Sequence, residues 1–435
     1  QGLSVYMDGV RLNQPFGDVV SWDLIPRSAL STVALMPGSN PLFGLNTLGG
    51  ALAIQTKDGL RDAGTSVQLM GGSWGRAAAE FETGGSDKAS GWNWFVSGNR
   101  LHEHGWRVDS PSDLRQLFAK IGRVARDGSI SLTAALADND LTGNGTQELG
   151  ALGRDWHSVR TIPDTTRNQA AFLNLSLMQA LNADWTLSGN AYYRNIKTRT
   201  FNGDVNDESM SESVYQPTAS ERAALAAAGY TGYPASGANA SNTPFPKWRC
   251  IANALLNTEP NEKCNGLLNR TETQQQNYGL AAQLSTQART GQLEHLLVLG
   301  AAYDASRIRF GQGTQFGYIN PDRTVTPVSG PGAFADGTQD SEDAFDARVD
   351  LRSRSRTASL FATDTIALDT RTHLTLSARY NRTTVDNSDQ LTPGGGAGSL
   401  DGHYTFGRLN PAVGLTFAPS EAVTLYAGAN QGSRA

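Results

Sequence analysis

The sequence contains no run of about 18 consecutive apolar residues, so it lacks the segment from which a transmembrane helix forms. A membrane-spanning β-strand needs only about 9–11 alternating residues and would escape that search. The net charge is -5 and the six histidines are scattered, which disfavours nucleic acid as a partner. With 47 glycines and only 18% charged residues, the chain is typical neither of a coiled coil nor of a disordered tail.

Motifs for common catalytic and metal sites are also missing. The chain has no phosphate-binding lysine motif, no HExxH and no four-cysteine pattern. The stretch GGSWG at 71–75 matches a nucleophile elbow, but it joins two predicted strands, whereas an elbow leads from a strand into a helix. His102 and His104 share one face of a strand end, but two ligands without a third favour a solvated loop. We therefore predict no enzyme activity, no catalytic residues, no metal site and no cofactor.

What the sequence does contain is alternation with a period of two, the spacing of a β-strand with one apolar face. Leu173, Leu175 and Leu177, for example, alternate with Asn174 and Ser176. Roughly thirteen such strands are predicted, more than the seven to nine of a soluble sandwich. Besides the runs around 173–177, 185–193 and 374–380, they lie near 64–71, 76–84, 91–101, 114–126, 129–138, 272–288, 292–309, 356–367, 407–418 and 421–430.

The connections between these strands alternate between short and long. The short ones lie at 84–91, 126–129, 179–184, 288–292, 367–372 and 418–421, and the long ones at 102–113, 139–167, 198–271, 310–355 and 386–406. All long connections therefore fall at one end of the sheet. That sorting is typical of an outer-membrane β-barrel, which has short periplasmic turns and long outer loops. Barrels with about 22 strands hold a plug in their lumen.

The N-terminal 60 residues have the pattern of such a plug. SVYMDGVRL predicts a strand that turns at Asp8 and Gly9, and ALAIQTK predicts another strand. LIPRSALSTVALMPG predicts a short helix or turn, with Ser28 as a possible cap, followed by a strand. Glycines 44, 49 and 50 are expected to turn the backbone with φ > 0 and to permit close packing. The predicted fold class is thus an all-β antiparallel transmembrane barrel with a small α+β plug.

Four segments, at 5–13, 21–57, 361–381 and 409–435, resemble TonB-dependent outer-membrane receptors. The plug motifs of that family are matched by Asp8, Gly9, Pro37, Gly38, Pro41, Phe43, Gly44, Gly49, Gly50, Thr56 and Lys57. This chain departs from the family pattern in two ways. Ala34 and Met36 stand where the family commonly has Glu and Arg, and Pro37-Gly38 reverses the usual order of that dipeptide.

The resemblance implies that residues 1–60 are the C-terminal half of a plug and that 61–435 are the N-terminal part of the barrel, roughly 13 of 22 strands. It implies an active transporter in the cell outer membrane that takes up a scarce extracellular ligand. A ferric siderophore is the first expectation, with cobalamin, glycans or peptides as alternatives. The implied partners are outer-membrane lipid and the inner-membrane TonB complex, which would bind a segment before Gln1. No leader is visible at Gln1, so we expect the chain to begin inside a longer protein.

Two other functions fit the residues alone. One is a passive porin or adhesin, in which the N-terminal segment is only a constriction. The other is a soluble secreted carbohydrate-binding β-protein. Sequence upstream of Gln1 would separate the receptor from the porin, and a soluble fold without detergent would favour the third.

The expected ligand contacts lie in the plug loop that points up the lumen. They are Asn13, Gln14, Phe16 and Asp18, with Trp22 nearby. Aromatic rings beside amides suit a polar ligand with flat surfaces. The alternative is that Phe16 and Trp22 only pack the plug against the barrel.

The only two cysteines, Cys250 and Cys264, lie in the longest outer loop. Their spacing is not CxxC and no histidine is close, so a disulfide is favoured over a metal or redox pair. In an oxidising compartment, closing a loop of this size contributes about 3 kcal/mol. The same loop contains SERAALAAAG at 220–229, which predicts a short helix capped by Ser220.

Overall fold

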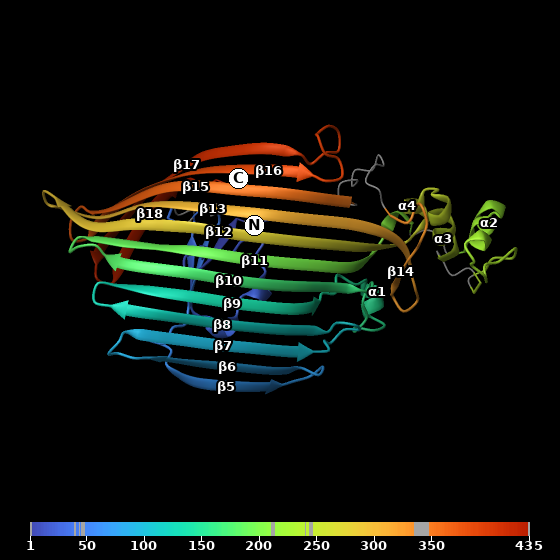
Figure 1. Cartoon of the computed structure of the whole chain (residues 1–435), viewed down its shortest axis with the longest axis horizontal. Helices are drawn as coiled ribbons and strands as arrows, with labels where there is room; N and C mark the ends of the chain where they lie inside the picture. Colours follow the sequence, from blue (N-terminus) through green and yellow to red (C-terminus); the bar gives the residue numbers. More distant parts are fainter. Residues whose placement is uncertain are drawn as a thin grey trace.

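The computed structural model describes residues 2–38, 41, 42, 44, 48–209, 214–239, 241, 242, 247–334 and 348–433. Of the predicted plug-motif residues, Phe43 lies outside this part of the chain. The described residues form a 4-stranded sheet and a 14-stranded sheet (Figure 1). No helix among them is both long and apolar enough to span a membrane.

The 14-stranded sheet, called the wall below, is antiparallel, and each strand pairs with its neighbours in sequence. The short strand β14 pairs only with β13, and β5 and β18 lie at the two ends of the order. The predicted antiparallel fold with about thirteen wall strands is confirmed. The strands are β5 (Gly64–Gly71), β6 (Ala77–Ser86), β7 (Trp92–Glu103), β8 (Ser112–Ala125), β9 (Gly128–Thr142), β10 (Asp164–Ala180), β11 (Trp185–Val205), β12 (Gly266–Thr290), β13 (Leu293–Ile319), β14 (Val325–Pro327), β15 (Arg348–Ala367), β16 (Thr372–Asp389), β17 (Gly402–Ser420) and β18 (Val423–Asn430).

The two faces of the wall differ in polarity. Leu136, Leu280 and Leu360 lie on the outer face and are 53%, 61% and 64% exposed. Asn139 and Asn174 lie on the inner face and are fully buried. A soluble sandwich buries its apolar face, so this sheet has the inverse arrangement. The outer face therefore requires an apolar surrounding.

Tight turns and long connections lie at opposite ends of the wall, as the sequence predicts. The four α-helices of the described residues lie at the long-loop end (Figure 1). Several strands run further into the long connections than predicted: β12 covers 266–290 instead of 272–288, and β13 covers 293–319 instead of 292–309. These extensions, GLLNRT at 266–271 and FGQGTQFGYI at 310–319, place glycines and polar residues among irregularly spaced apolar ones, so they carry no clear apolar alternation. They pair all the same because each continues an established ladder.

The second sheet has the order β2-β1-β4-β3 and belongs to the N-terminal unit, residues 2–58 as far as described. Asp8 and Gly9 have φ values of 46° and 84°, which confirms the predicted tight turn between β1 and β2. Gly50 also has positive φ (134°), but Gly49 does not, so that expectation was wrong for Gly49. The elements are β1 (Leu3–Met7), β2 (Val10–Arg11), the 3-10 helices η1 (Trp22–Leu24) and η2 (Arg27–Ala29), β3 (Leu30–Pro37) and β4 (Gly50–Thr56).

The predicted capping role of Ser28 was wrong. Ser28 lies inside η2, whose N-cap is Pro26, and it is buried. Its hydroxyl donates instead to the Ser97 hydroxyl of β7 at 3.0 Å. The residue therefore fastens the N-terminal unit to the wall, because a buried hydroxyl needs a partner wherever the fold provides one.

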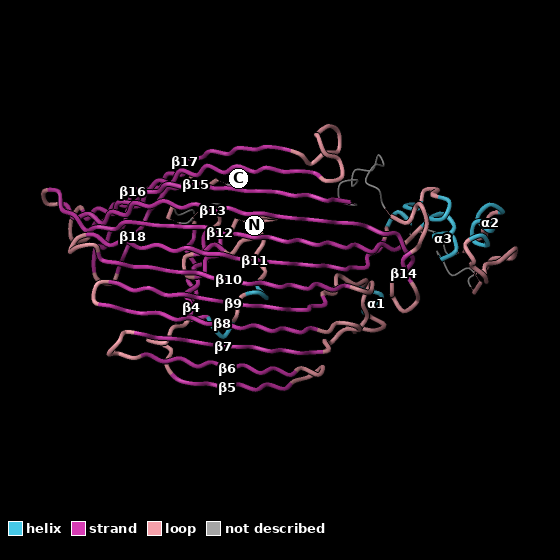
Figure 2. The backbone as a smooth tube through the Cα atoms, in the orientation of Figure 1, coloured by secondary structure: helices cyan, strands magenta, loops and turns pink. Residues whose placement is uncertain are grey.

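The N-terminal unit packs against the inner face of the wall, where β4 lies behind the wall strands in Figure 2. Val5, Met7 and Ile54 form one apolar core with Phe95 and Phe118 of the wall. Two ion pairs join the units as well. Lys57 pairs with Glu82, and Lys120 of β8 lies 3.1 Å from the Asp8 carboxylate. Charge contacts thus persist although Ala34 and Met36 replace the family's usual charged pair.

The long connection between β11 and β12 is a helical module with its own apolar core. The helix predicted at 220–229 is confirmed as α2, but its cap is Thr218 and not Ser220. Thr218 forms a capping box with Glu221, three residues on, whereas Ala223 follows Ser220 at that distance. The helices and the 3-10 turn at this end are α1 (Leu149–Leu152), η3 (Asp207–Ser209), α2 (Ala219–Ala227), α3 (Lys247–Leu256) and α4 (Pro260–Lys263).

Candidate ligand site

Asn13 opens the plug loop in which the sequence predicts ligand contacts, and it is only 4% exposed. Its side-chain oxygen accepts from the Val5 amide at 2.8 Å, and its amide group donates to the Leu3 carbonyl at 3.0 Å. An Asn that satisfies the backbone of a neighbouring strand fixes the loop to it. Asn13 thus holds the loop in place and also borders the cavity described below.

Gln14 and Phe16 face the wall. The Gln275 side chain of β12 donates to the Gln14 side chain at 2.6 Å and accepts from the Phe16 amide at 3.3 Å. The Phe16 ring lies 4.8 Å from the ring of Phe310 on β13. The buried side chain of Gln275 therefore hydrogen-bonds to two residues of the loop. The contact between the two phenylalanine rings holds the loop against β13 as well.

Asp18 and Trp22 lie in different surroundings. The Asp18 carboxylate accepts from the Arg11 guanidinium at 2.6 Å, and both residues line the cavity. Trp22 is 55% exposed and is not part of the cavity lining. Its neighbour Asp23 anchors η1, because its carboxylate accepts from Asn139 at 3.1 Å and Asn168 at 2.9 Å. The structure thus brings four of the predicted residues to one region and leaves Trp22 apart.

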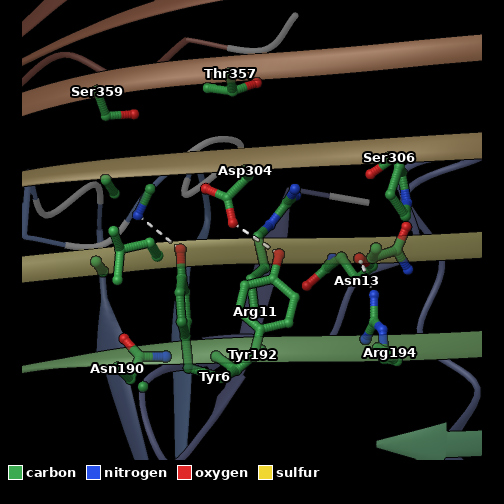
Figure 3. A pocket seen from close by; sticks show the side chains of 18 of the residues that line it. Tyr6, Arg11, Asn13, Asn190, Tyr192, Arg194, Asp304, Ser306, Thr357 and Ser359 are labelled. Carbon is green, nitrogen blue, oxygen red and sulfur yellow. Dashed lines mark hydrogen bonds between the residues drawn. The ribbon is translucent and has the colours of Figure 1, made fainter. Parts of the chain in front are cut away.

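A cavity of about 600 Å³ lies between the N-terminal unit and strands β10 to β16 (Figure 3). Its wall carries charged residues that the sequence analysis did not single out. The Tyr192 hydroxyl donates to the Asp304 carboxylate at 2.7 Å, and the Arg379 guanidinium lies over the Phe361 ring at 5.0 Å. Each falls on the inner, polar parity of its strand. An ionisable residue at an inner position of a strand is the signal that would have identified them.

Arg194 connects the cavity wall to the predicted loop. Its guanidinium donates to the Leu12 carbonyl at 2.6 Å and to the Asn13 carbonyl at 3.1 Å. Figure 3 shows it pointing from β11 toward Asn13. With Arg11 and Arg379, three guanidinium groups line one cavity, against the carboxylates of Asp8, Asp18 and Asp304.

Several buried polar atoms at this cavity hydrogen-bond to no described residue. They are Arg11 Nε, Asp18 Oδ2, Arg194 Nε and both side-chain polar atoms of Asn277. Buried polar groups are nearly always paired in folded proteins, so such atoms mark places for a ligand or water. The cluster supplies donors mainly, from guanidinium and amide groups, which suits an anionic or carbonyl-rich guest.

Tyr6 contributes a phenol from β1 to the same cavity, and its oxygen accepts from the Gly44 amide at 2.6 Å. Burial raises the pKa of Tyr6, although Arg11 and Arg379 oppose that shift. The phenol is therefore neutral at physiological pH. Gly44 permits this contact, because a Cβ there would lie 3.0 Å from the Tyr6 oxygen.

Cys250 and Cys264 form a disulfide bond with an S–S distance of 2.02 Å. The bond joins α3 to the end of α4, and both residues are fully buried in the core of the loop module. Glu221 and Asn253 add a buried hydrogen bond of 2.9 Å between α2 and α3. The module is therefore a packed unit at the long-loop end.

The two histidines considered as metal ligands have their rings 5.0 Å apart, and His102 pairs with Asp113 at 3.1 Å. No group of three or more metal-ligating side chains occurs in the described part of the chain. The GGSWG stretch connects β5 to β6 as a strand-to-strand turn.

The family model described as TonB dependent receptor-like, beta-barrel matches residues 105–435. Similar solved structures include the ferric-catecholate import receptor Fiu from E. coli (TM-score 0.70, 12% identity, 99% of this chain and 63% of that one). The ferric citrate transporter FecA matches with a TM-score of 0.68 and 11% identity, over 98% of this chain and 53% of that one. The siderophore receptor PiuA from Acinetobacter baumannii matches with a TM-score of 0.65 and 12% identity, over 98% of this chain and 56% of that one. No curated protein sequence is significantly similar.

The chain thus spans between 53% and 63% of the length of these structures. At such low identity they show the fold, while the family match covers most of this sequence. Members of that family are transporters of the outer membrane and not enzymes, which also excludes the soluble secreted alternative. The N-terminal unit packs against the inner face of the wall, and the polarity of the wall is inverted relative to a soluble sandwich. Both observations agree with the family match, which shows that this chain belongs to the TonB-dependent receptors.

Proposed function

We propose that the protein is an active transporter that binds a ferric siderophore outside the cell and releases it into the periplasm. Residues 1–60 are then the second half of the plug, and 61–435 are the first part of the barrel. The observation that carries the proposal is the cavity between these two parts, which is lined by Arg11, Arg194 and Arg379 and holds unpartnered donor atoms of Arg11 and Arg194. Iron chelates built on carboxylates or catecholates are anionic, and guanidinium groups bind such oxygens in bidentate fashion.

The plug loop supplies the remaining contacts in this proposal. Asn13 and Gln14 line the cavity and offer amides, and Phe16 offers a flat apolar surface beside them, whereas Trp22 stays outside the cavity lining. Asp18 orients Arg11, since the two side chains are only 2.6 Å apart. A ligand that draws the Arg11 guanidinium toward itself weakens that pair, so ligand binding and loop conformation are coupled.

Transport requires the plug to move, and this movement has to break the hydrogen bonds between the plug loop and the wall. Arg194 and Gln275 hold the backbone or side chains of residues 12–16. In the proposal, the TonB complex pulls on a segment before Gln1, and the proton gradient of the inner membrane supplies the energy. A passive porin would not need a lumen domain held by so many specific bonds.

Growth of a deletion strain on single sources of iron, cobalamin or glycan tests the function. Loss of growth on one ferric siderophore, restored by the wild-type gene, supports the proposal, and unchanged growth on every source contradicts it. The complementing variant Arg11→Gln is expected to weaken uptake at limiting ligand. The matched variant Arg199→Gln changes an arginine on the outer face, paired with Glu272, and is expected to behave as wild type.

A further inference from the structure

Six arginines form a patch on the outer face of the wall, beyond the cavity and away from the N-terminal unit. All are exposed, and all lie at alternate, outward positions near the long-loop end of three adjacent strands. Arg307 lies directly opposite Arg354 across the β13 and β15 pair, and Arg309 lies opposite Arg352. The arginine patch consists of Arg307, Arg309, Arg352, Arg354, Arg356 and Arg382.

The patch begins where the apolar belt ends. Tyr303 on β13 and Tyr380 on β16 face outward and are 44% and 46% exposed. Arg307 follows Tyr303 by two outward positions, and Arg382 follows Tyr380 by one. Aromatic residues of barrels mark the boundary between acyl chains and headgroups. The arginines therefore lie at headgroup depth, on the side of the long loops, which faces outside in this family.

The neighbouring sector of the wall shows what charges at this height normally do. On β9 to β12, Arg167 lies 3.3 Å from Asp138, and Glu272 accepts from both Lys197 (3.0 Å) and Arg199 (3.3 Å). Arg167 and Arg199 lie opposite each other across β10 and β11, but each of them also has a carboxylate partner on its other side.

The arginine patch has no such pairing. None of its six residues forms an ion pair or side-chain hydrogen bond with another described residue. Two carboxylates border the patch: Asp386, opposite Arg354, pairs with His403 at 2.5 Å instead, and Asp350, two residues before Arg352, forms no ion pair with a described residue. Like charges directly opposite each other destabilise a sheet, so a surface that keeps two such pairs side by side is built for an external anion.

We propose that the arginine patch binds the phosphate groups of anionic lipid headgroups in the outer leaflet. Guanidinium groups bind phosphate oxygens in bidentate fashion, and rows of them two residues apart match a surface of several phosphates. The adjoining tyrosines and leucines bind the acyl region of the same lipid. A freely diffusing phosphate would gain nothing from that apolar surface, so the position selects a lipid over a soluble anion.

The complete chain in a neutral detergent tests this proposal. Phosphatidylglycerol and zwitterionic phosphatidylcholine are the lipid probes, and inorganic phosphate is the soluble one. Native mass spectrometry counts the retained lipid, and the unfolding midpoint reports stabilisation by bound lipid. We expect retention of phosphatidylglycerol over phosphatidylcholine, and no comparable effect of inorganic phosphate.

The test variant replaces Arg307, Arg309, Arg352 and Arg354 by Gln. Each arginine near an anionic surface contributes about fivefold in affinity, so the variant should bind phosphatidylglycerol several hundred times more weakly. It should fold normally, because it removes two repulsive pairs. The control replaces Lys197 and Arg199, the paired cations at the same height, and should retain its lipid preference.

Four outcomes overturn the proposal. Equal retention of both lipids by the wild type is the first, and equal binding by the test variant and the wild type is the second. The third is competition by inorganic phosphate alone, which would indicate a soluble-anion site. The fourth concerns the acidic sequence QDSEDAFD at 339–346. If only its amide-substituted variant, with Asn and Gln in place of Asp and Glu, retained phosphatidylglycerol, the patch would belong to that segment.

Discussion

The inner and outer faces of β13 differ in charge, burial and polarity. Its inner positions carry Asp304 and Phe310, which meet Tyr192 and the plug loop. Its outer positions carry Leu299, then Tyr303, then Arg307, without a described polar partner. Charge is thus buried and paired on the inside, and apolar surface is exposed on the outside.

This difference teaches which solvent each face was selected for. The inner face follows the rules of a protein interior, where an ionisable group needs a hydrogen-bond partner. The outer face follows the rules of a bilayer, where depth decides whether leucine, tyrosine or arginine is stable. The predictions below test that assignment, from the largest expected effect to the smallest.

The largest effect is expected from Leu280→Arg on the outer face of β12. Leu280 is 61% exposed within the apolar belt, and a cation at the middle of a bilayer costs about 2–4 kcal/mol. Urea titration of the chain refolded in vesicles measures the change in the free energy of unfolding. The control Gln276→Arg lies on the same face, four residues nearer the long-loop end, and should cost less than about 1 kcal/mol. Equal costs at both depths would refute the assignment of the outer face to lipid.

Arg194→Met tests the inner face. It removes two charge-assisted hydrogen bonds to the Leu12 and Asn13 carbonyls, which are left buried, at a cost of about 2 kcal/mol. Hydrogen exchange of the Leu12 amide should then be roughly 30-fold faster, because the loop opens locally. The comparison variant Arg199→Met, on the outer face of the same strand, should leave this rate unchanged. Unchanged exchange in both variants would show that the loop is held elsewhere.

Charge reversal on the outer face separates its two sectors. Arg309→Glu places a carboxylate opposite Arg352 on one side and the neutral Gln274 on the other, so it should stabilise the chain in neutral detergent by about 0.2–1 kcal/mol. Glu272→Arg brings a third cation beside Lys197 and Arg199 and should destabilise by a similar amount. Both changes should shrink at high salt, since the groups are exposed. If both variants changed the free energy of unfolding in the same direction, the two sectors would not differ in charge balance.

The smallest effect concerns Asp58, in the connection between the N-terminal unit and the wall. Burial raises the pKa of Asp58, but hydrogen bonds from the Arg61 side chain and from the Arg61 and Leu60 amides outweigh it, and the pKa is lowered. Because its folded-state pKa is lowered, ionised Asp58 stabilises the folded protein at pH values above the ordinary aspartate pKa of about 3.9. This stabilisation is lost as the pH falls through the folded-state pKa. The stability difference between wild type and Asp58→Asn should therefore vanish in acid. A difference that grows as pH falls would contradict this.

The fold was largely predictable because alternation and connection length are local properties. Leu173 to Leu177 and the short turns specify strands and their order without any knowledge of tertiary contacts. The strand ends were not predictable where the regular apolar alternation breaks down, as on β12 and β13. The caps at Ser28 and Ser220 failed for a related reason: which hydroxyl caps a helix depends on a third residue, Ser97 or Glu221, that decides between near-equal candidates.

The site was predictable only in part. The loop from Asn13 to Asp18 follows from its place after a strand and turn, and it does border the cavity. Arg194, Asp304 and Arg379 come from three strands spread over 186 residues of sequence, and only pairing register brings them together. The arginine patch is likewise invisible in the sequence, because Arg307 and Arg354 become neighbours only across a ladder.

The hairpin of β12 and β13 has a further consequence. Its strands contain 25 and 27 residues, and at about 3.3 Å per residue each measures roughly 80–90 Å, against about 30 Å of hydrocarbon. Even with a steep tilt, much of that length projects beyond the bilayer, and the disulfide-closed module lies at the outer end of the projection (Figure 1). Large objects near the cell therefore contact the projecting hairpin well before they reach the membrane surface, while small solutes pass beside it into the lumen.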